Sequence, residues 1–111
     1  MSIGVFRFEK NNLETESKQL FFASVSGEDT YTRLWTKAIK DTNTKIFKAD
    51  SEFTIEQVEI VLDELHNLMK WCEEKLEKNS RDYNYMQRHI KFLIKSISEE
   101  AHKGNEKFYI F

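Results

Sequence analysis

The feature that most constrains the fold of this chain is a pair of long amphipathic segments joined by a very short connection. In the first segment, from about residue 55 to 77, apolar side chains recur at three- and four-residue steps, the period of a helix with one buried face. This apolar stripe consists of Val58, Val61, Leu62, Leu65, Met69, Cys72 and Leu76. Thr54 and Gln57 have the T-x-x-Q spacing of a capping box, so the sequence predicts a helix that begins just after Thr54.

The second amphipathic segment follows Asn79 and Ser80, which end the first helix and provide a cap for the next. Its stripe consists of Tyr83, Met86, Ile90, Leu93, Ile94 and Ile97. Lys103 and Gly104 predict its end, with Gly104 available for a left-handed C-cap. Because the connection is only a few residues long, the two helices are expected to form an antiparallel hairpin.

The rest of the chain predicts four short strands and one shorter helix. Strands are expected over about 3–9, 19–25, 45–49 and 107–111, from alternating or aromatic and β-branched runs next to polar turn residues. The first two are expected to pair in antiparallel fashion.

In the first strand, Ile3, Val5 and Phe8 are expected to share the apolar face. A helix over about 28–40 is predicted by apolar residues at helical spacing, with Ser26 and Asp29 as a relative of the capping box.

This order of elements predicts an α+β fold for a single domain spanning residues 1–111. A small mixed or antiparallel sheet of about four strands is expected to pack one face against the hairpin. The chain has 9 Phe, 4 Tyr and 2 Trp residues, more rings than two helix stripes need. The open face of the sheet is therefore an alternative contact surface, although aromatic side chains in a small domain belong more often to the core.

Composition excludes several classes of protein. The chain has no apolar run of the length of a membrane span, and its first residues lack the pattern of a signal peptide, which predicts a cytoplasmic protein. One Cys allows no intramolecular disulfide and no Cys-rich zinc cluster. With 17 basic and 19 acidic side chains, the net charge is −2, so direct binding to nucleic acid or to a membrane is not expected.

The histidines and the cysteine are the candidates for chemistry. His66 and His102 each follow a carboxylate by three residues, as in di-metal bundles, but such bundles need further Glu-bearing helices that the chain lacks. Cys72 lies on the apolar stripe and is expected to be inert, with His89 the one residue that could activate it. The sequence therefore predicts no metal, no cofactor and no enzymatic activity, and an enzyme built around His66 or His89 ranks third among the hypotheses.

The charge is unevenly distributed. From residue 50 to 64 there are six acidic and no basic side chains, so the segment carries −6 and, with −2 overall, the remainder carries +4. The predicted partner-binding residues are Asp50, Glu52, Glu56, Glu59, Asp63 and Glu64. Helix dipoles explain acidic residues in a first helical turn but not those further along, and the alternative is a solvated helix face.

Size, cytoplasmic character, the lack of catalytic motifs and this acidic segment make the chain similar in type to the small immunity proteins that protect bacteria from toxins. The hypothesis is an inhibitor that neutralises a toxin, such as a nuclease, by presenting the acidic flank to a basic surface of its protein partner. The alternative is a small regulatory or phage-encoded protein that binds another protein or nucleic acid through the helical hairpin. Either could be a monomer or a homodimer.

Overall fold

The computed structural model describes residues 2–8, 19–104 and 107–111 of the chain. Four strands and two long helices dominate these residues. In chain order the elements are β1 (Ser2–Phe8), β2 (Gln19–Gly27), α1 (Glu28–Thr30), a π-helix (Tyr31–Trp35), α2 (Thr36–Thr42), β3 (Ser51–Phe53), a 3-10 turn (Ile55–Gln57), α3 (Val58–Lys75), α4 (Arg81–Glu100) and β4 (Phe108–Ile110).

The strands form one antiparallel sheet in the order β2-β1-β4-β3. The predicted α+β class is confirmed, as is the antiparallel pairing of the first two strands. The C-terminal strand β4 lies inside the sheet, where Ile110 is the register partner of Val5 on one side and of Ser51 on the other. This strand therefore connects the β1–β2 pair to β3 within one open sheet.

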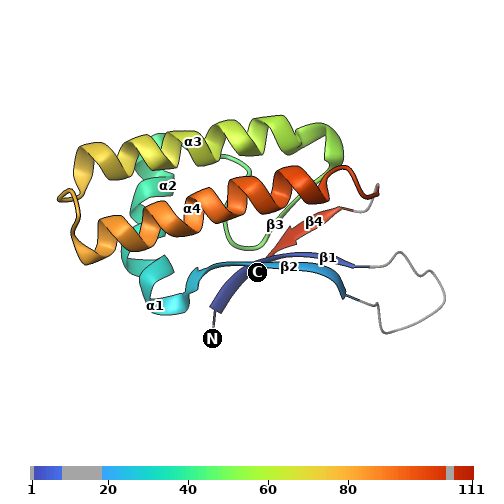
Figure 1. Ribbon diagram of the computed structural model, residues 1–111, viewed down its shortest axis with the longest axis horizontal. Coiled ribbons are helices and arrows are strands. Elements are labelled where there is room, and N and C mark those ends of the chain that lie inside the picture. The colour runs from blue at the N-terminus through green and yellow to red at the C-terminus, as the bar shows by residue number, and fades with distance from the viewer. Residues whose placement is uncertain (1, 9–18, 105–106) are drawn as a thin grey trace.

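The helices α3 and α4 run antiparallel and lie on one side of the sheet, with α1 and α2 at one end of the molecule (Figure 1). Most of both predicted apolar stripes is buried against the inward face of the sheet, but Leu62, Met69, Leu76, Tyr83 and Ile94 are only partly buried. The buried face of α3 also includes Leu68 and Trp71, which the predicted stripe lacks. The buried apolar side chains include Val5, Val25, Trp35, Phe47, Phe53, Val61, Leu65, Leu68, Cys72, Met86, Ile90, Leu93, Ile97, Phe108 and Ile110. No helix within the described residues covers the other face of the sheet (Figure 1).

The predicted caps are present, although Thr54 and Gln57 cap the 3-10 turn that leads into α3 and α3 itself begins at Val58. The backbone N–H of Thr54 donates to Gln57 Oε1 at 2.9 Å, and the backbone N–H of Tyr83 donates to Ser80 Oγ at 3.2 Å. The ends differ slightly from the prediction. Helix α3 stops at Lys75, since Leu76 is extended, and Gly104 has no positive φ because α4 has already ended at Glu100.

The predicted strand over 45–49 is wrong, and the third strand lies further along the chain at Ser51–Phe53. The cause is Glu64, whose carboxylate accepts the backbone N–H groups of Lys45, Ile46 and Phe47 at 2.7 to 3.2 Å. Three consecutive amides that point at one carboxylate cannot also form a strand ladder. The chain turns here instead and buries the Phe47 ring.

The predicted cap at Ser26 is also wrong. The N-cap of α1 is Gly27 without a side-chain cap, and Ser26 Oγ donates to the Gly27 carbonyl at 2.9 Å. The helical segment that follows is interrupted by the π-helix, which places Tyr31 and Trp35 in a stack with ring centroids 6.4 Å apart. The Tyr31 hydroxyl accepts the backbone N–H of Ala49 at 2.7 Å and so holds the 44–50 turn against this helix.

A charged residue takes the inward position where the sequence predicts Phe8. Arg7 is 2% exposed, and its Nη1 lies 3.2 Å from Glu100 Oε1 at the end of α4. The same nitrogen donates to the Glu100 carbonyl at 3.3 Å, and the guanidinium lies over the Phe108 ring. Pairing with Glu100 offsets part of the cost of burying both charges, and β1 directs Arg7 inward and Phe8 to the opposite face.

Candidate functional site on the open face of the sheet

Strand alternation brings five aromatic side chains together on the uncovered face of the sheet. They are Phe6 and Phe8 of β1, Phe22 of β2, Tyr109 of β4 and the terminal Phe111, and we call them the aromatic surface. Their neighbours in sequence, such as Val5 and Phe108, are buried on the other face. In a strand, successive side chains point to opposite faces, so both faces of β1 and β4 carry large apolar groups.

Phe6 lies at the centre of the aromatic surface. Its ring centroid is 4.6 Å from that of Phe111, 5.0 Å from Phe22 and 5.8 Å from Phe8. Phe8 in turn lies 6.1 Å from Tyr109 and 6.4 Å from Phe111. These are the stacked and tilted distances that aromatic pairs prefer, so the rings form one connected cluster.

Two rings of the cluster are open to solvent, whereas Phe6, Phe8 and Tyr109 are partly buried. Phe22 is 46% exposed and Phe111 is 50% exposed, and Leu20 at the edge of the sheet is 42% exposed. By contrast the Phe side chains of the opposite face, including Phe53 and Phe108, are buried in the core. Contiguous exposed rings of this kind are characteristic of protein interaction surfaces, since their burial by a partner removes apolar area from water.

Gly4 allows the rings to lie close to the backbone of β1. A Cβ atom placed on Gly4 would be 2.5 Å from Phe22 Cε1, closer than side chains tolerate. The absence of a side chain at this residue lets the Phe22 ring cover the strand and reach Phe6.

The charges next to the aromatic surface neutralise each other. Glu52 of β3 is the register partner of Tyr109, and its Oε1 lies 3.4 Å from Lys107 Nζ. Both side chains are about half exposed, so this ion pair contributes little to stability. It balances two of the charges that lie beside Tyr109.

The six acidic residues of the predicted partner-binding surface have different surroundings in the structure. Asp50 lies in the turn before β3 with a φ of 64°, and Glu52 pairs with Lys107. Glu64 is bound to the amides of the 45–47 segment and stabilises the fold. The remaining three, Glu56, Glu59 and Asp63, are exposed and form no ion pair within the described part of the chain. Hydrogen bonds from its own backbone amide and from Thr54 lower the pKa of Glu56.

The histidines do not assemble a chemical site. His66 Nδ1 bonds to the Leu62 carbonyl at 2.8 Å, and His89 Nδ1 bonds to the Tyr85 carbonyl at 2.9 Å, so each ring is tied to its own helix. His102 lies past the end of α4 and is exposed. Within residues 2–8, 19–104 and 107–111, no three His, Cys, Asp or Glu side chains come together as metal ligands do.

Cys72 is a core residue rather than a nucleophile. Its side chain is fully buried on the apolar stripe of α3, as the sequence predicts. Burial raises the pKa of the Cys72 thiol to about 11, so the reactive thiolate is scarce at neutral pH. His89 is the histidine that the sequence analysis named as a possible activator of Cys72. Its ring stacks on that of Tyr85, with the centroids 4.1 Å apart.

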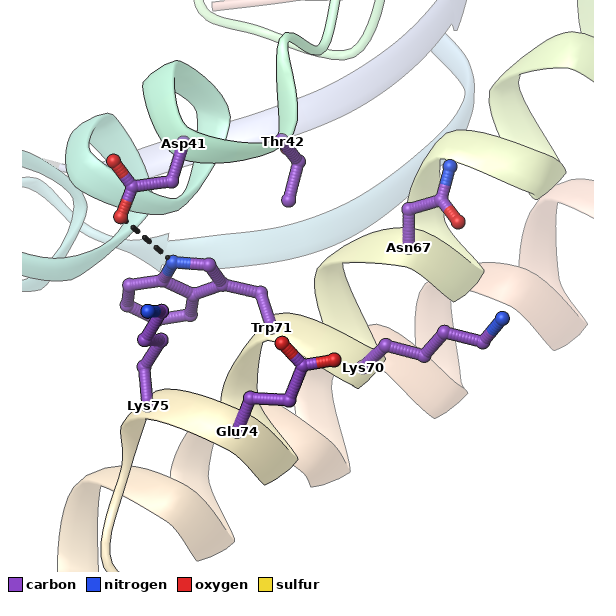
Figure 2. Close-up of a pocket in the computed structure, with 7 residues that line it drawn as sticks. All are labelled: Asp41, Thr42, Asn67, Lys70, Trp71, Glu74 and Lys75. Carbon is purple, nitrogen blue, oxygen red and sulfur yellow. Dashed lines mark hydrogen bonds between the residues drawn. The ribbon is translucent and has the colours of Figure 1, made fainter.

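A cleft between α2 and α3 is a second candidate. It measures about 520 Å³ and is lined by Asp41, Thr42, Asn67, Lys70, Trp71, Glu74 and Lys75 (Figure 2). Trp71 Nε1 donates to Asp41 Oδ2 at 2.9 Å, and only 5% of Trp71 is exposed. The cleft therefore presents charged groups of both signs and very little aromatic surface, which selects for no particular ligand.

The aromatic surface has a detectable signal in the sequence. In β2 and β4, aromatic residues stand at adjacent positions, Phe21 with Phe22 and Phe108 with Tyr109, which is the pattern of a strand with apolar groups on both faces. The sequence shows the excess of rings but not which of them gather on the open face, because that depends on the register of three strands.

No known protein family matches the chain, and no characterised protein or solved structure is significantly similar to it. Among the helices in the described ranges, none combines the length and the apolar character needed to cross a membrane.

Proposed function

We propose that this chain is a small protein-binding protein that acts by contact rather than by catalysis, and that the aromatic surface is its contact surface. The observation that carries the proposal is the connected cluster of five rings on an uncovered sheet face, with Phe22 and Phe111 about half exposed. Aromatic side chains in such a position are the residues that most often dominate binding energy. Exposed rings of this kind favour a partner with an apolar patch.

The proposal is tested with the partner recovered by affinity purification from the native host. Phe22→Ser and Phe111→Ser each remove a half-exposed ring and should weaken binding on the order of tenfold or more. Ile60→Ser is the matched control, because Ile60 is 52% exposed but lies on α3. Unchanged affinity in both Phe variants, with all three proteins folded by circular dichroism, would refute the aromatic surface as the contact.

A second candidate is the immunity-type inhibitor that binds a basic toxin surface. It is favoured by Glu56, Glu59 and Asp63, which are exposed on or next to the first turns of α3. Reversal of Glu59 and Asp63 to Lys should slow association with a basic partner and reduce its salt dependence, because peripheral charges act through electrostatic steering. Folding should survive, since exposed helix charges contribute only tenths of a kcal/mol.

The two candidates are separated by the same set of variants. Loss of binding in Glu59→Lys/Asp63→Lys and in Ile60→Ser, with Phe22→Ser unaffected, identifies the acidic flank. Loss of binding in Phe22→Ser, with Glu59→Lys/Asp63→Lys and Ile60→Ser unaffected, identifies the aromatic surface. Protection of cells against a toxin domain encoded next to this gene is the direct measure of inhibition.

A further inference from the structure

The two edges of the sheet differ in how they are protected. At one edge, β3 is three residues long and carries Glu52. Short length and charge are devices by which natural sheets prevent their edges from pairing with other strands. At the other edge, β2 has nine residues, Gln19–Gly27, with no charged side chain and no proline.

The pairing of β2 with β1 leaves a regular segment at the middle of this edge. Leu20 and Val25 are extra residues at two bulges, since the register passes from Phe21 to Gln19 and from Ser26 to Ser24. Between the bulges, residues 21–24 are in continuous register. A strand added along β2 would therefore meet a regular ladder of four residues.

Helix α4 presents a flank with aromatic side chains and the exposed Arg88 on the same side of the molecule. The Tyr85 hydroxyl accepts the backbone N–H of Gly27 at 3.3 Å, which places the Tyr85 flank of α4 beside β2. His89 and Phe92 follow at helical steps on that flank, and Phe92 is 50% exposed. The opposite flank of α4 faces α3, where Gln87 Nε2 donates to the Met69 carbonyl at 3.2 Å.

We propose that a second copy of this chain pairs with the β2 edge, antiparallel and about a two-fold axis near the 21–24 segment. An antiparallel strand edge is complementary to itself under such an axis, so the same residues serve both partners. The edge carries no charge, so two copies do not repel each other there. The paired sheets would place Leu20 and Phe22 of the two copies side by side and extend the aromatic surface across both.

The size of this contact sets the strength of the dimer. A four-residue ladder with Leu20, Phe22 and Phe92 provides less than the roughly 800 Å² per partner of a standard interface. We therefore expect a weak dimer that forms only at micromolar or higher protein concentrations. The proposal is independent of the proposed function, because a partner protein could bind the aromatic surface of a monomer or of a dimer.

Sedimentation equilibrium from about 10 to 500 μM tests the proposal, since this range brackets a micromolar dissociation constant. The parent should change from monomer to dimer with concentration. The double variant Leu20→Lys/Ser24→Lys places two charges on the edge and should raise the dissociation constant at least tenfold. The matched control, Leu20→Thr/Ser24→Thr, keeps the edge uncharged and should still dimerise.

Two further variants locate the interface without changing the edge strand. Phe92→Ser should weaken the dimer, whereas Phe111→Ser, which lies on the aromatic surface away from the edge, should not. A parent that stays monomeric throughout the range, or a dimer unaffected by the Lys pair, overturns the proposal. A dimer lost in Phe111→Ser also overturns it, since the copies would then pack through their open faces.

Discussion

The ring of Phe22 lies against Gly4 of the neighbouring strand, so close that a methyl group on Gly4 would be 2.5 Å from Phe22 Cε1. This contact joins β1 and β2 on the open face and positions Phe22 5.0 Å from the central ring of Phe6. The width of the aromatic surface therefore depends on a residue that has no side chain.

Gly4→Ala should displace the Phe22 ring and weaken binding through the aromatic surface. The stability should change by less than about 1 kcal/mol, because a ring that is half exposed can move and alanine restricts the unfolded strand more than glycine. Nuclear Overhauser contacts between the Phe22 ring and the Gly4 Hα protons measure the displacement. Gly27→Ala is the control, since a Cβ there meets no atom within 4 Å. Unaltered ring contacts in Gly4→Ala would contradict this account.

Glu64→Ala should destabilise the protein by about 2 to 4 kcal/mol, because three backbone amides, two of them partly buried, lose a charged acceptor at once. Urea denaturation followed by fluorescence measures the change. Glu59→Ala, an exposed acidic residue of the same helix, should change stability by no more than about 0.5 kcal/mol. Equal effects of the two variants would mean that the 45–47 turn holds its shape without Glu64.

Leu65→Ala and Leu93→Ala should each cost about 2 to 5 kcal/mol, since both side chains are fully buried where α3 and α4 meet the sheet. Thermal unfolding monitored by circular dichroism is the measurement. Melting temperatures that match the parent in both variants would refute the packing of the hairpin.

Deletion of residues 107–111 should abolish stable folding. These residues include β4, which pairs with β1 on one side and β3 on the other, and the buried Phe108 and Ile110. A chain end usually tolerates truncation, but here the last strand is internal to the sheet. A truncated protein with cooperative unfolding at the parent temperature would show that the sheet holds without its C-terminal strand.

Cys72 should react with a thiol reagent at pH 8 only after unfolding. Burial raises the pKa of its thiol to about 11 from a usual value of 9.0, so the folded protein holds about a hundredth of the thiolate of the unfolded chain. Because the unfolded chain releases the proton first, the contribution of Cys72 to stability is complete below the unfolded pKa and is lost as the pH rises toward the folded pKa. Cys72→Ala should remove that part of the alkaline destabilisation. Equal labelling rates with and without denaturant would contradict the burial.

The amino-acid sequence by itself determined the elements that depend on neighbours along the chain. The stripes of α3 and α4, the Thr54–Gln57 and Ser80 caps and the short connection between the helices all follow from residues within a few positions of each other. Helical hydrogen bonds and caps are local, so a single sequence contains the information that they need. The apolar β4 segment is recognisable for the same reason.

Tertiary structure alone decided the features that depend on residues far apart in the chain. Glu64 looks like one more acid on a helix flank until the 45–47 turn brings its amides to the carboxylate. Arg7 can face the core because Glu100, 93 residues away, meets it there. The aromatic surface likewise exists only once β4 enters between β1 and β3, since the register of paired strands brings Tyr109 and Phe111 next to Phe6 and Phe8. Strand pairing and ion pairs across the core join residues without regard to their separation in sequence, which is why local patterns do not encode them.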